Sequence, residues 1–164
     1  MRKEIWRFVF LYVLLITAFV LLIGLEPVQR IVDLNGLYTG FIIRLSALLL
    51  KPLGIITGTE GSIIYLRNGA LRVLFGCNGL EAFLIYSAAV LAFRASHRQK
   101  LLGILVGFWV LQFFNVLRIA MLSLMYVHFK QYFYLFHVYV AQGFMIALSF
   151  LLFLGYLHHV SRQN

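Results

Sequence analysis

Apolar residues fill most of this chain in long runs that few charged positions interrupt. Four of these runs are long enough to form a membrane helix, which takes about 20 residues. They predict crossings at about residues 7–25, 75–93, 101–123 and 137–157. The pattern therefore predicts an all-α integral membrane protein with about four transmembrane helices in a single domain, 1–164.

The composition excludes the other broad classes of protein. Apolar residues make up 63% of the chain and charged residues only 12%, against about 25% charged residues in soluble domains. Two prolines and one cysteine argue against a disordered chain and a disulfide scaffold. The net charge of +9 suits an anionic membrane leaflet. Its bases are spread over both sides of the predicted helices, so nucleic acid is not expected as a partner.

Short basic segments orient the predicted crossings. Bases precede the first crossing, lie in the connector 94–100 and follow the last crossing: Arg2, Lys3, Arg7, Arg94, Arg98, Lys100 and Arg162. Four crossings put these three segments on one side, which the positive-inside rule identifies as the cytoplasm. The opposite side has six bases, but in longer segments. We therefore expect both termini in the cytoplasm and residues 26–74 on the outer side.

The apolar stretch 36–56 has two interpretations. Arg44 and Lys51 are two helical turns apart and share a face, which is typical of a helix in the outer interface with its bases reaching water. Pro52 and Gly54 would end that helix. A fifth crossing is the alternative, and it would reverse the sidedness of everything before it.

Residues 62–74 read as a short β-hairpin. Asn68-Gly69 is the preferred dipeptide of a two-residue type I′ turn. That turn would pair Leu66 with Leu71 and Ile64 with Val73, on one apolar face. We expect this face to rest on the membrane surface or on the interfacial helix. The hairpin is either a stiff connector or an edge strand to which an extended peptide can add.

Three polar residues of three predicted helices reach a similar depth. Cys77 lies about 26 Å of helix before the connector 94–100, and Arg118 lies about 27 Å after it. His158 lies at the inner end of the last crossing, and His137 lies about 32 Å of helix before it. All three are therefore expected near the outer edge of the bilayer, and apolar patterning does not require this convergence.

These residue types form a set suited to attack on a carbonyl group. A thiolate is a nucleophile, and a neighbouring base or cation favours it over the thiol. A histidine moves the proton, and an arginine donates to a developing oxyanion. Cys77 is the only cysteine, so it has no disulfide or redox partner within the chain. A small packing residue is the alternative interpretation of Cys77.

The local sequences around these residues resemble the exosortase/archaeosortase family of membrane cysteine transpeptidases. They are GCNGL at 76–80, NVLRI at 115–119, and His137 before an apolar last helix that contains Gly143. The resemblance covers about half of the chain. With one crossing before the cysteine helix, the chain looks most like the short exosortase H type.

The resemblance implies a bacterial inner-membrane enzyme that cleaves C-terminal sorting signals of exported proteins at the outer, periplasmic face. Its substrates would be membrane-anchored proteins with a short motif, an apolar helix and a basic tail. Carried over to this chain, Cys77 is the nucleophile, Arg118 the oxyanion or substrate-orienting residue, and His137 the general acid and base. No cofactor or metal is implied.

Other polar residues are candidates for binding or orienting the substrate. Asn78 stands where many relatives carry Ser or Thr. Glu81, the only acid in a predicted crossing, is expected to pair with Arg118 and orient it. Asn115 shares the face of Arg118 and either holds it, contacts substrate or bonds another helix. His128 competes with His137 as the base.

Two alternatives stay open. The chain could be a non-enzymatic membrane protein, such as a small transporter subunit or assembly factor, with a structural pair of Glu81 and Arg118. Separately, Gly103-x-x-x-Gly107 is typical of close helix packing, either within one chain or between two.

Overall fold

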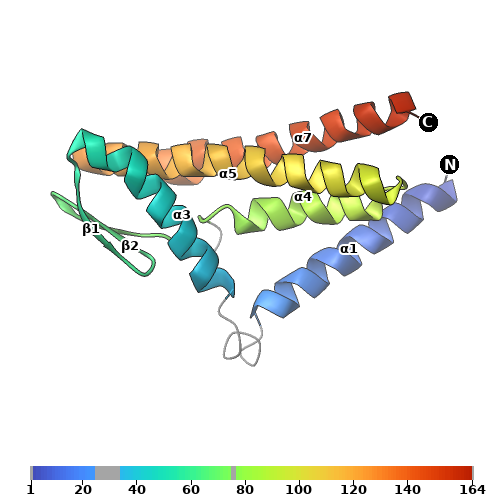
Figure 1. The fold of residues 1–164 in the computed structure, drawn as a ribbon, viewed down its shortest axis with the longest axis horizontal. Helices are drawn as coiled ribbons and strands as arrows, with labels where there is room; N and C mark the ends of the chain where they lie inside the picture. Colours follow the sequence, from blue (N-terminus) through green and yellow to red (C-terminus); the bar gives the residue numbers. More distant parts are fainter. Residues whose placement is uncertain (1, 25–33, 75–76, 164) are drawn as a thin grey trace.

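The structure is a computed structural model that describes residues 2–24, 34–74 and 77–163 (Figure 1). It is mainly helical, with one small antiparallel sheet. The predicted fold class, an all-α membrane protein with a short hairpin, is confirmed. The elements are α1 (Arg2–Gly24), α3 (Leu34–Leu50), a 3₁₀ turn (Lys51–Leu53), β1 (Ile56–Glu60), β2 (Ile63–Leu66), β3 (Gly69–Arg72), α4 (Leu80–Ala92), α5 (His97–His128), a 3₁₀ turn (Lys130–Tyr132), α6 (Phe133–Leu135), a π-helical turn (Phe136–Ala141) and α7 (Gln142–Gln163).

Four helical segments are long and apolar enough to cross a membrane, and they lie at Arg2–Leu22, Gly36–Leu53, His97–His128 and Lys130–Arg162. This set differs from the four predicted crossings because it includes α3 and omits α4. Helix α4 has 13 residues and is therefore about 20 Å long. It is shorter than the predicted 75–93 because residues 77–79 form a turn before it begins.

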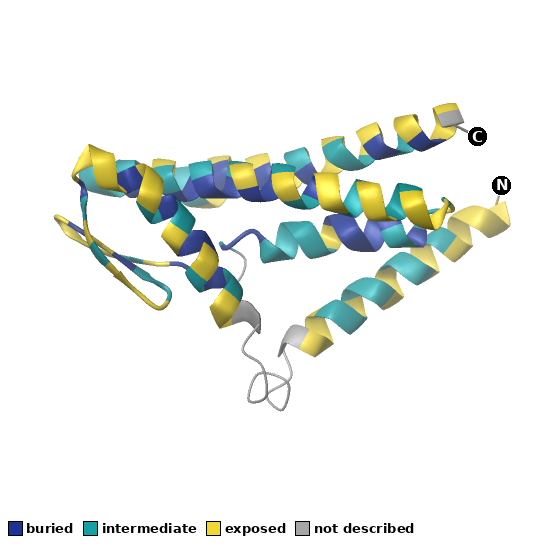
Figure 2. Ribbon diagram, viewed as in Figure 1, coloured by how far each residue is buried: buried dark blue, intermediate teal, exposed yellow. Residues whose placement is uncertain are grey.

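The helices form a bundle whose two ends differ (Figure 1). Both termini and the connection between α4 and α5 lie at one end, and α3 and the sheet lie at the other. An ion pair between Glu4 and Arg94 ties the start of α1 to that connection. This arrangement agrees with the prediction that both termini and the connector 94–100 share one side. Helix α1 has no buried residue in its described part (Figure 2).

The sheet has the order β1-β2-β3, and its register differs from the predicted one. Leu66 pairs with Gly69, and Ile64 with Leu71, so the predicted pairs of Leu66 with Leu71 and Ile64 with Val73 are wrong. A type I′ turn needs positive φ at both central residues. In the described chain only glycines have positive φ, so Asn68 lacks the φ that this turn requires. The two-residue turn is therefore Arg67-Asn68, one position earlier.

The apolar face of the hairpin was nevertheless predicted correctly. The observed register differs from the predicted one by a shift of two residues along β3. Because side chains alternate between the two faces of a strand, this shift leaves Ile64, Leu66, Leu71 and Val73 on one face. These residues pack against Ile42 and Ile43 of α3 and Val116 and Ile119 of α5, and Cys77 borders this cluster. The sheet is therefore held against α3 and α5. Contact with the helix within 36–56 was one of the two supports expected, and contact with α5 was not expected.

A second apolar cluster joins α4, α5 and α7 through Tyr86, Val90, Leu111, Met145, Tyr156 and Val160. The two glycines of the Gly103-x-x-x-Gly107 motif receive aromatic rings of the same chain. The Tyr156 ring lies against Gly103, the Tyr86 ring lies against Gly107, and the Tyr86 hydroxyl donates to the Gly103 carbonyl at 2.9 Å. The motif therefore serves packing within the chain.

Candidate active site

Cys77 lies in the turn between the edge strand β3 and helix α4. Its backbone N–H donates to the Leu74 carbonyl at 2.9 Å, which ties Cys77 to the segment that follows the strand. The side chain is half-buried and borders the cluster between the sheet, α3 and α5. The nucleophile expected from the sequence is therefore held by the end of the sheet on one side and the start of α4 on the other.

The side chain of Asn78 fixes this turn through two hydrogen bonds. Its side chain is fully buried, and its Nδ2 donates to Thr39 Oγ1 of α3 at 2.9 Å. Its Oδ1 accepts from the Leu80 N–H at 3.1 Å, one of the N–H groups that the first turn of α4 leaves without a helical partner. Asn78 thus anchors the cysteine turn to α3 and to its own helix.

Asn115 holds the same turn from α5. Its Nδ2 donates to the Asn78 carbonyl oxygen at 2.6 Å, and its side chain is fully buried. Of the roles considered for Asn115, the geometry matches a bond to another segment of the chain. Gly79 makes this approach feasible, because a Cβ there would lie 2.6 Å from Asn115 Cγ. Gly79 also has φ of +80°, a value that residues with a Cβ rarely adopt.

His137 comes from the π-helical turn Phe136–Ala141, an irregularity that often marks functional sites in helices. Its Nε2 lies 3.5 Å from Cys77 Sγ. The ring stacks on Phe133, four residues earlier, with centroids 5.7 Å apart and planes within 5°. Its Nδ1 is buried without a hydrogen-bond partner among the described residues. Cysteine and histidine therefore form a dyad oriented by stacking.

Arg118 completes the group from α5. Only 5% of its surface is exposed, and its guanidinium interacts electrostatically with the Cys77 side chain. Nε and Nη2 are buried and have no partner within the described chain. The three residues predicted to converge are thus brought together from three segments, and Arg118 retains two unused donors beside the thiol.

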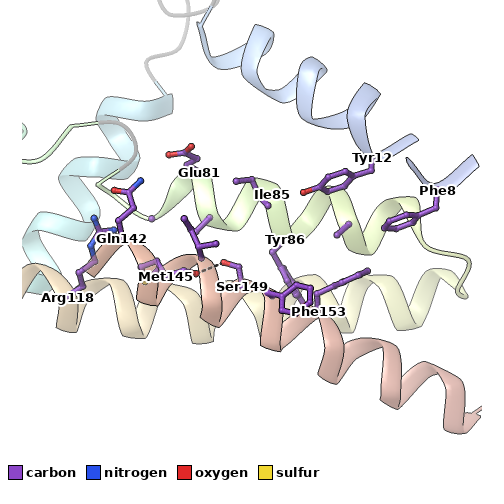
Figure 3. Close-up of a pocket in the computed structure, with 15 residues that line it drawn as sticks. Phe8, Tyr12, Glu81, Ile85, Tyr86, Arg118, Gln142, Met145, Ser149 and Phe153 are labelled. Atoms are coloured by element: carbon purple, nitrogen blue, oxygen red, sulfur yellow. Dashed lines mark hydrogen bonds between the residues drawn. The ribbon is translucent and has the colours of Figure 1, made fainter. Parts of the chain in front are cut away.

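Glu81 and His128 lie differently from these three. Glu81, in the first turn of α4, attracts Arg118 electrostatically. The ion pair expected between them is not formed within 4.0 Å in the described structure, and Figure 3 shows the carboxylate directed away from Arg118. His128 is exposed at the end of α5. Its ring neighbours Phe129, and the histidine within reach of Cys77 is His137.

Two cavities meet this group of residues. The first, here called the edge cavity, has a volume of about 220 Å³ and is lined by residues 70–74 of β3 and its continuation, Cys77, Ile119, Leu122, Tyr126, Phe133 and His137. The second, the helix cavity, has about 390 Å³ between α1, α4 and α7. Arg118, Glu81 and Gln142 lie at one end of it, and Phe8 and Phe153 lie at the other (Figure 3).

Sequence reasoning missed several residues that line these cavities. Gln142 borders the helix cavity beside Arg118. Its signal was present, because an amide in a predicted crossing is costly and draws attention. Tyr126 and Phe133 line the edge cavity and contact each other edge to face, with centroids 5.4 Å apart. Aromatic residues are common at membrane boundaries, so the sequence alone gave no signal that these two line a cavity.

Metal binding receives no support from the described side chains. In residues 2–24, 34–74 and 77–163, no group of three or more His, Cys, Asp and Glu is placed to hold an ion.

Comparison with known proteins identifies the family. A family model described as transmembrane exosortase (Exosortase_EpsH) matches residues 3–155, a range that includes Cys77, Arg118 and His137. Curated proteins and solved structures gave no significant match. The family match agrees with the resemblance carried by the sequences around the three residues. This chain therefore belongs to the transmembrane exosortase family.

Proposed function

We propose that this exosortase-family protein is a cysteine transpeptidase or peptidase that cleaves C-terminal sorting signals of membrane-anchored proteins. One observation carries the proposal: Cys77 Sγ lies 3.5 Å from His137 Nε2, beside an arginine with two buried donor nitrogens that have no partner among the described residues. Apolar packing alone does not account for this set of side chains. The roles of nucleophile, base and oxyanion donor account for all three.

The first half of the reaction forms a thioester. His137 Nε2 accepts the proton of the Cys77 thiol, and the thiolate attacks the carbonyl carbon of the scissile peptide bond. The negative charge that develops on the carbonyl oxygen is stabilised by Arg118. When the C–N bond breaks, His137 returns its proton to the leaving amine. The amine carries away the C-terminal signal, and the rest of the substrate stays bonded to Sγ.

The second half frees the enzyme. An amine or hydroxyl of an acceptor, or water, loses a proton to His137 and attacks the thioester carbonyl. Arg118 again stabilises the oxyanion, the C–S bond breaks, and the Cys77 sulfur regains a proton from His137. Transfer to an acceptor gives a transpeptidase, and transfer to water gives a hydrolase.

The two cavities suggest where the substrate lies. The edge cavity contains the dyad and suits the segment with the scissile bond. The helix cavity, with apolar walls from α1, α4 and α7, suits part of the apolar helix of the substrate. Arg118 lies near Cys77 and also lines the helix cavity. A substrate that lies along both cavities would pass Cys77 at the point where the sorting motif of the substrate meets the apolar helix of the substrate.

The topology proposed with this function places both termini in the cytoplasm and Cys77 at the outer, periplasmic face of the bacterial inner membrane. It rests on the bases near the termini and in the connector 94–100, all at one end of the bundle (Figure 1). The dyad lies toward the opposite end, beside α3 and the sheet. A non-enzymatic role built on a pair of Glu81 and Arg118 gains no support, since the described structure does not form that ion pair.

The test is co-expression with candidate C-terminally anchored substrates, comparing wild type, Cys77→Ala and His128→Ala. We expect wild type and His128→Ala to release a product of the same mass, and Cys77→Ala to release none. Mass spectrometry should find the thioester adduct on Cys77. Equal processing by the Cys77→Ala variant would exclude the cysteine mechanism.

A further inference from the structure

The outer edge of the sheet lies beside the candidate catalytic dyad. β3 is the last strand in the order β1-β2-β3, so one of its edges pairs with no described strand. Such an edge offers backbone N–H and C=O groups to any extended chain laid against it.

The register identifies the backbone groups that face outward. The Val73 N–H donates to the Ser62 carbonyl, and Ile64 pairs with Leu71. Hydrogen-bonded positions alternate along an antiparallel strand, so Leu71 and Val73 point their peptide groups toward β2. The peptide groups of Ala70 and Arg72 therefore point away from the sheet.

This free edge forms one wall of the edge cavity. Five consecutive residues, 70–74, line the cavity together with Cys77 and His137. The opposite wall comes from α5 and α6, including Tyr126 and Phe133. A strand added to β3 at the usual spacing of about 4.8 Å would enter this cavity. Its backbone would then pass Cys77, which lines the same cavity.

From this juxtaposition we infer that the substrate segment with the scissile bond binds as an added β-strand along the outer edge of β3. The inference rests on the proposed function. Outward groups of Ala70 and Arg72 supply up to two N–H donors and two C=O acceptors to the substrate backbone. Recognition through the backbone tolerates varied side chains, and alternate side chains of the substrate would face the aromatic wall of the cavity.

The test uses the single cysteine of the chain as its reporter. The purified full-length protein is treated with acetyl-Ala-Ala-Ala chloromethyl ketone or with iodoacetamide, and intact mass follows alkylation of Cys77. The peptide electrophile can pair with β3, and iodoacetamide cannot. The ratio of the two rates therefore measures pairing separately from thiol reactivity.

Proline substitutions remove the outward N–H groups and leave the bonds to β2 intact, since proline lacks a backbone donor. We expect Ala70→Pro and Arg72→Pro each to lower the ratio of rates about five- to tenfold, as for the loss of one backbone hydrogen bond. The matched control is Thr59→Pro. Thr59 of β1 pairs with Ile64, whose peptide groups point toward β3, so the peptide groups of Thr59 face outward on the opposite edge of the sheet. The control should keep the wild-type ratio.

The peptide gives a second, independent reading. Methylation of one of two adjacent amide nitrogens in the electrophile should slow its reaction about tenfold, and methylation of the other should have little effect, because only alternate amides face the edge. Equal effects of both methylations, or equal ratios for all proline variants, would overturn the inference. Failure of the proposed function gives a different result: His137→Ala would leave the iodoacetamide rate unchanged.

Discussion

Replacing Gly79 with alanine should disturb the turn that holds Cys77 in two ways, through the positive φ of this position and through a steric contact with Asn115. A Cβ at Gly79 would lie 2.6 Å from Asn115 Cγ, 2.7 Å from Nδ2 and 3.0 Å from Cβ. Asn115 is fully buried, so its side chain has little room to move. The positive φ costs about 1–2 kcal/mol for a residue with a Cβ, and overpacking adds about 1–3 kcal/mol.

Gly61 provides the matched control. It also has positive φ, at +53°, but a Cβ there meets no atom within 4 Å. Gly61→Ala therefore carries the backbone cost without the contact. We expect Gly79→Ala to be less stable than Gly61→Ala by about 1–3 kcal/mol, or roughly 2–12 °C in thermal unfolding for a domain of this size.

The functional effect should exceed the effect on stability. Relief of the contact breaks the bond from Asn115 to the Asn78 carbonyl and moves Cys77, two residues from Gly79. A displacement of about 1 Å in a catalytic group lowers rates by about 10²-fold. At temperatures where the Gly79→Ala variant is still folded, cleavage of a co-expressed substrate should be slower than in wild type. The reaction of Cys77 with iodoacetamide should be slower as well. Equal stability and activity of the two alanine variants would refute this account of the turn.

Three further predictions follow from the packing and the site. Gly107→Ala should destabilise the protein by about 1–3 kcal/mol because a buried tyrosine ring of α4 occupies the space of its Cβ, whereas Gly143→Ala, with nothing within 4 Å, should be neutral or stabilising in thermal unfolding. His137→Gln should lower substrate cleavage by about 10²- to 10⁴-fold, and His128→Gln should not. Arg118→Lys should lower cleavage by about 10²-fold, because one ammonium cannot replace the planar guanidinium donors; wild-type rates would contradict its role at the oxyanion.

Counting helical residues predicted that Cys77, Arg118 and His137 lie at a similar depth, and the structure brings the three together. The rise of an α-helix is nearly constant, so sequence distance converts to depth with small error, and long side chains cover the remainder. The same reasoning did not predict that helix α4 starts only at Leu80. The turn that holds Cys77 is fixed by buried asparagines and shows no periodic pattern of apolar residues. Because apolar residues precede it, the predicted crossing began too early.

The hairpin shows a limit of local signals. Asn68-Gly69 favours a type I′ turn in isolation, but β2 also pairs with β1, and the Tyr126 hydroxyl lies 2.6 Å from where a Gly69 Cβ would be. These contacts come from distant segments. The strand β1 was itself missed, because Thr57, Gly58 and Thr59 give no alternation of apolar residues. The apolar face was predicted correctly because its period survives the change of turn.

The polar groups around Cys77 differ in what they contact. The Asn78 side chain bonds Thr39 and Leu80, and Asn115 Nδ2 bonds the Asn78 carbonyl, whereas Asn115 Oδ1 is buried with no partner among the described residues. Beside the thiol, Nε and Nη2 of Arg118 are buried without one in the described chain. An unsatisfied buried donor costs about 1–3 kcal/mol, and apolar residues often replace buried charges without loss of stability. Packing therefore does not explain an arginine here, whereas the proposed role, at a negative charge that develops on a bound substrate, does.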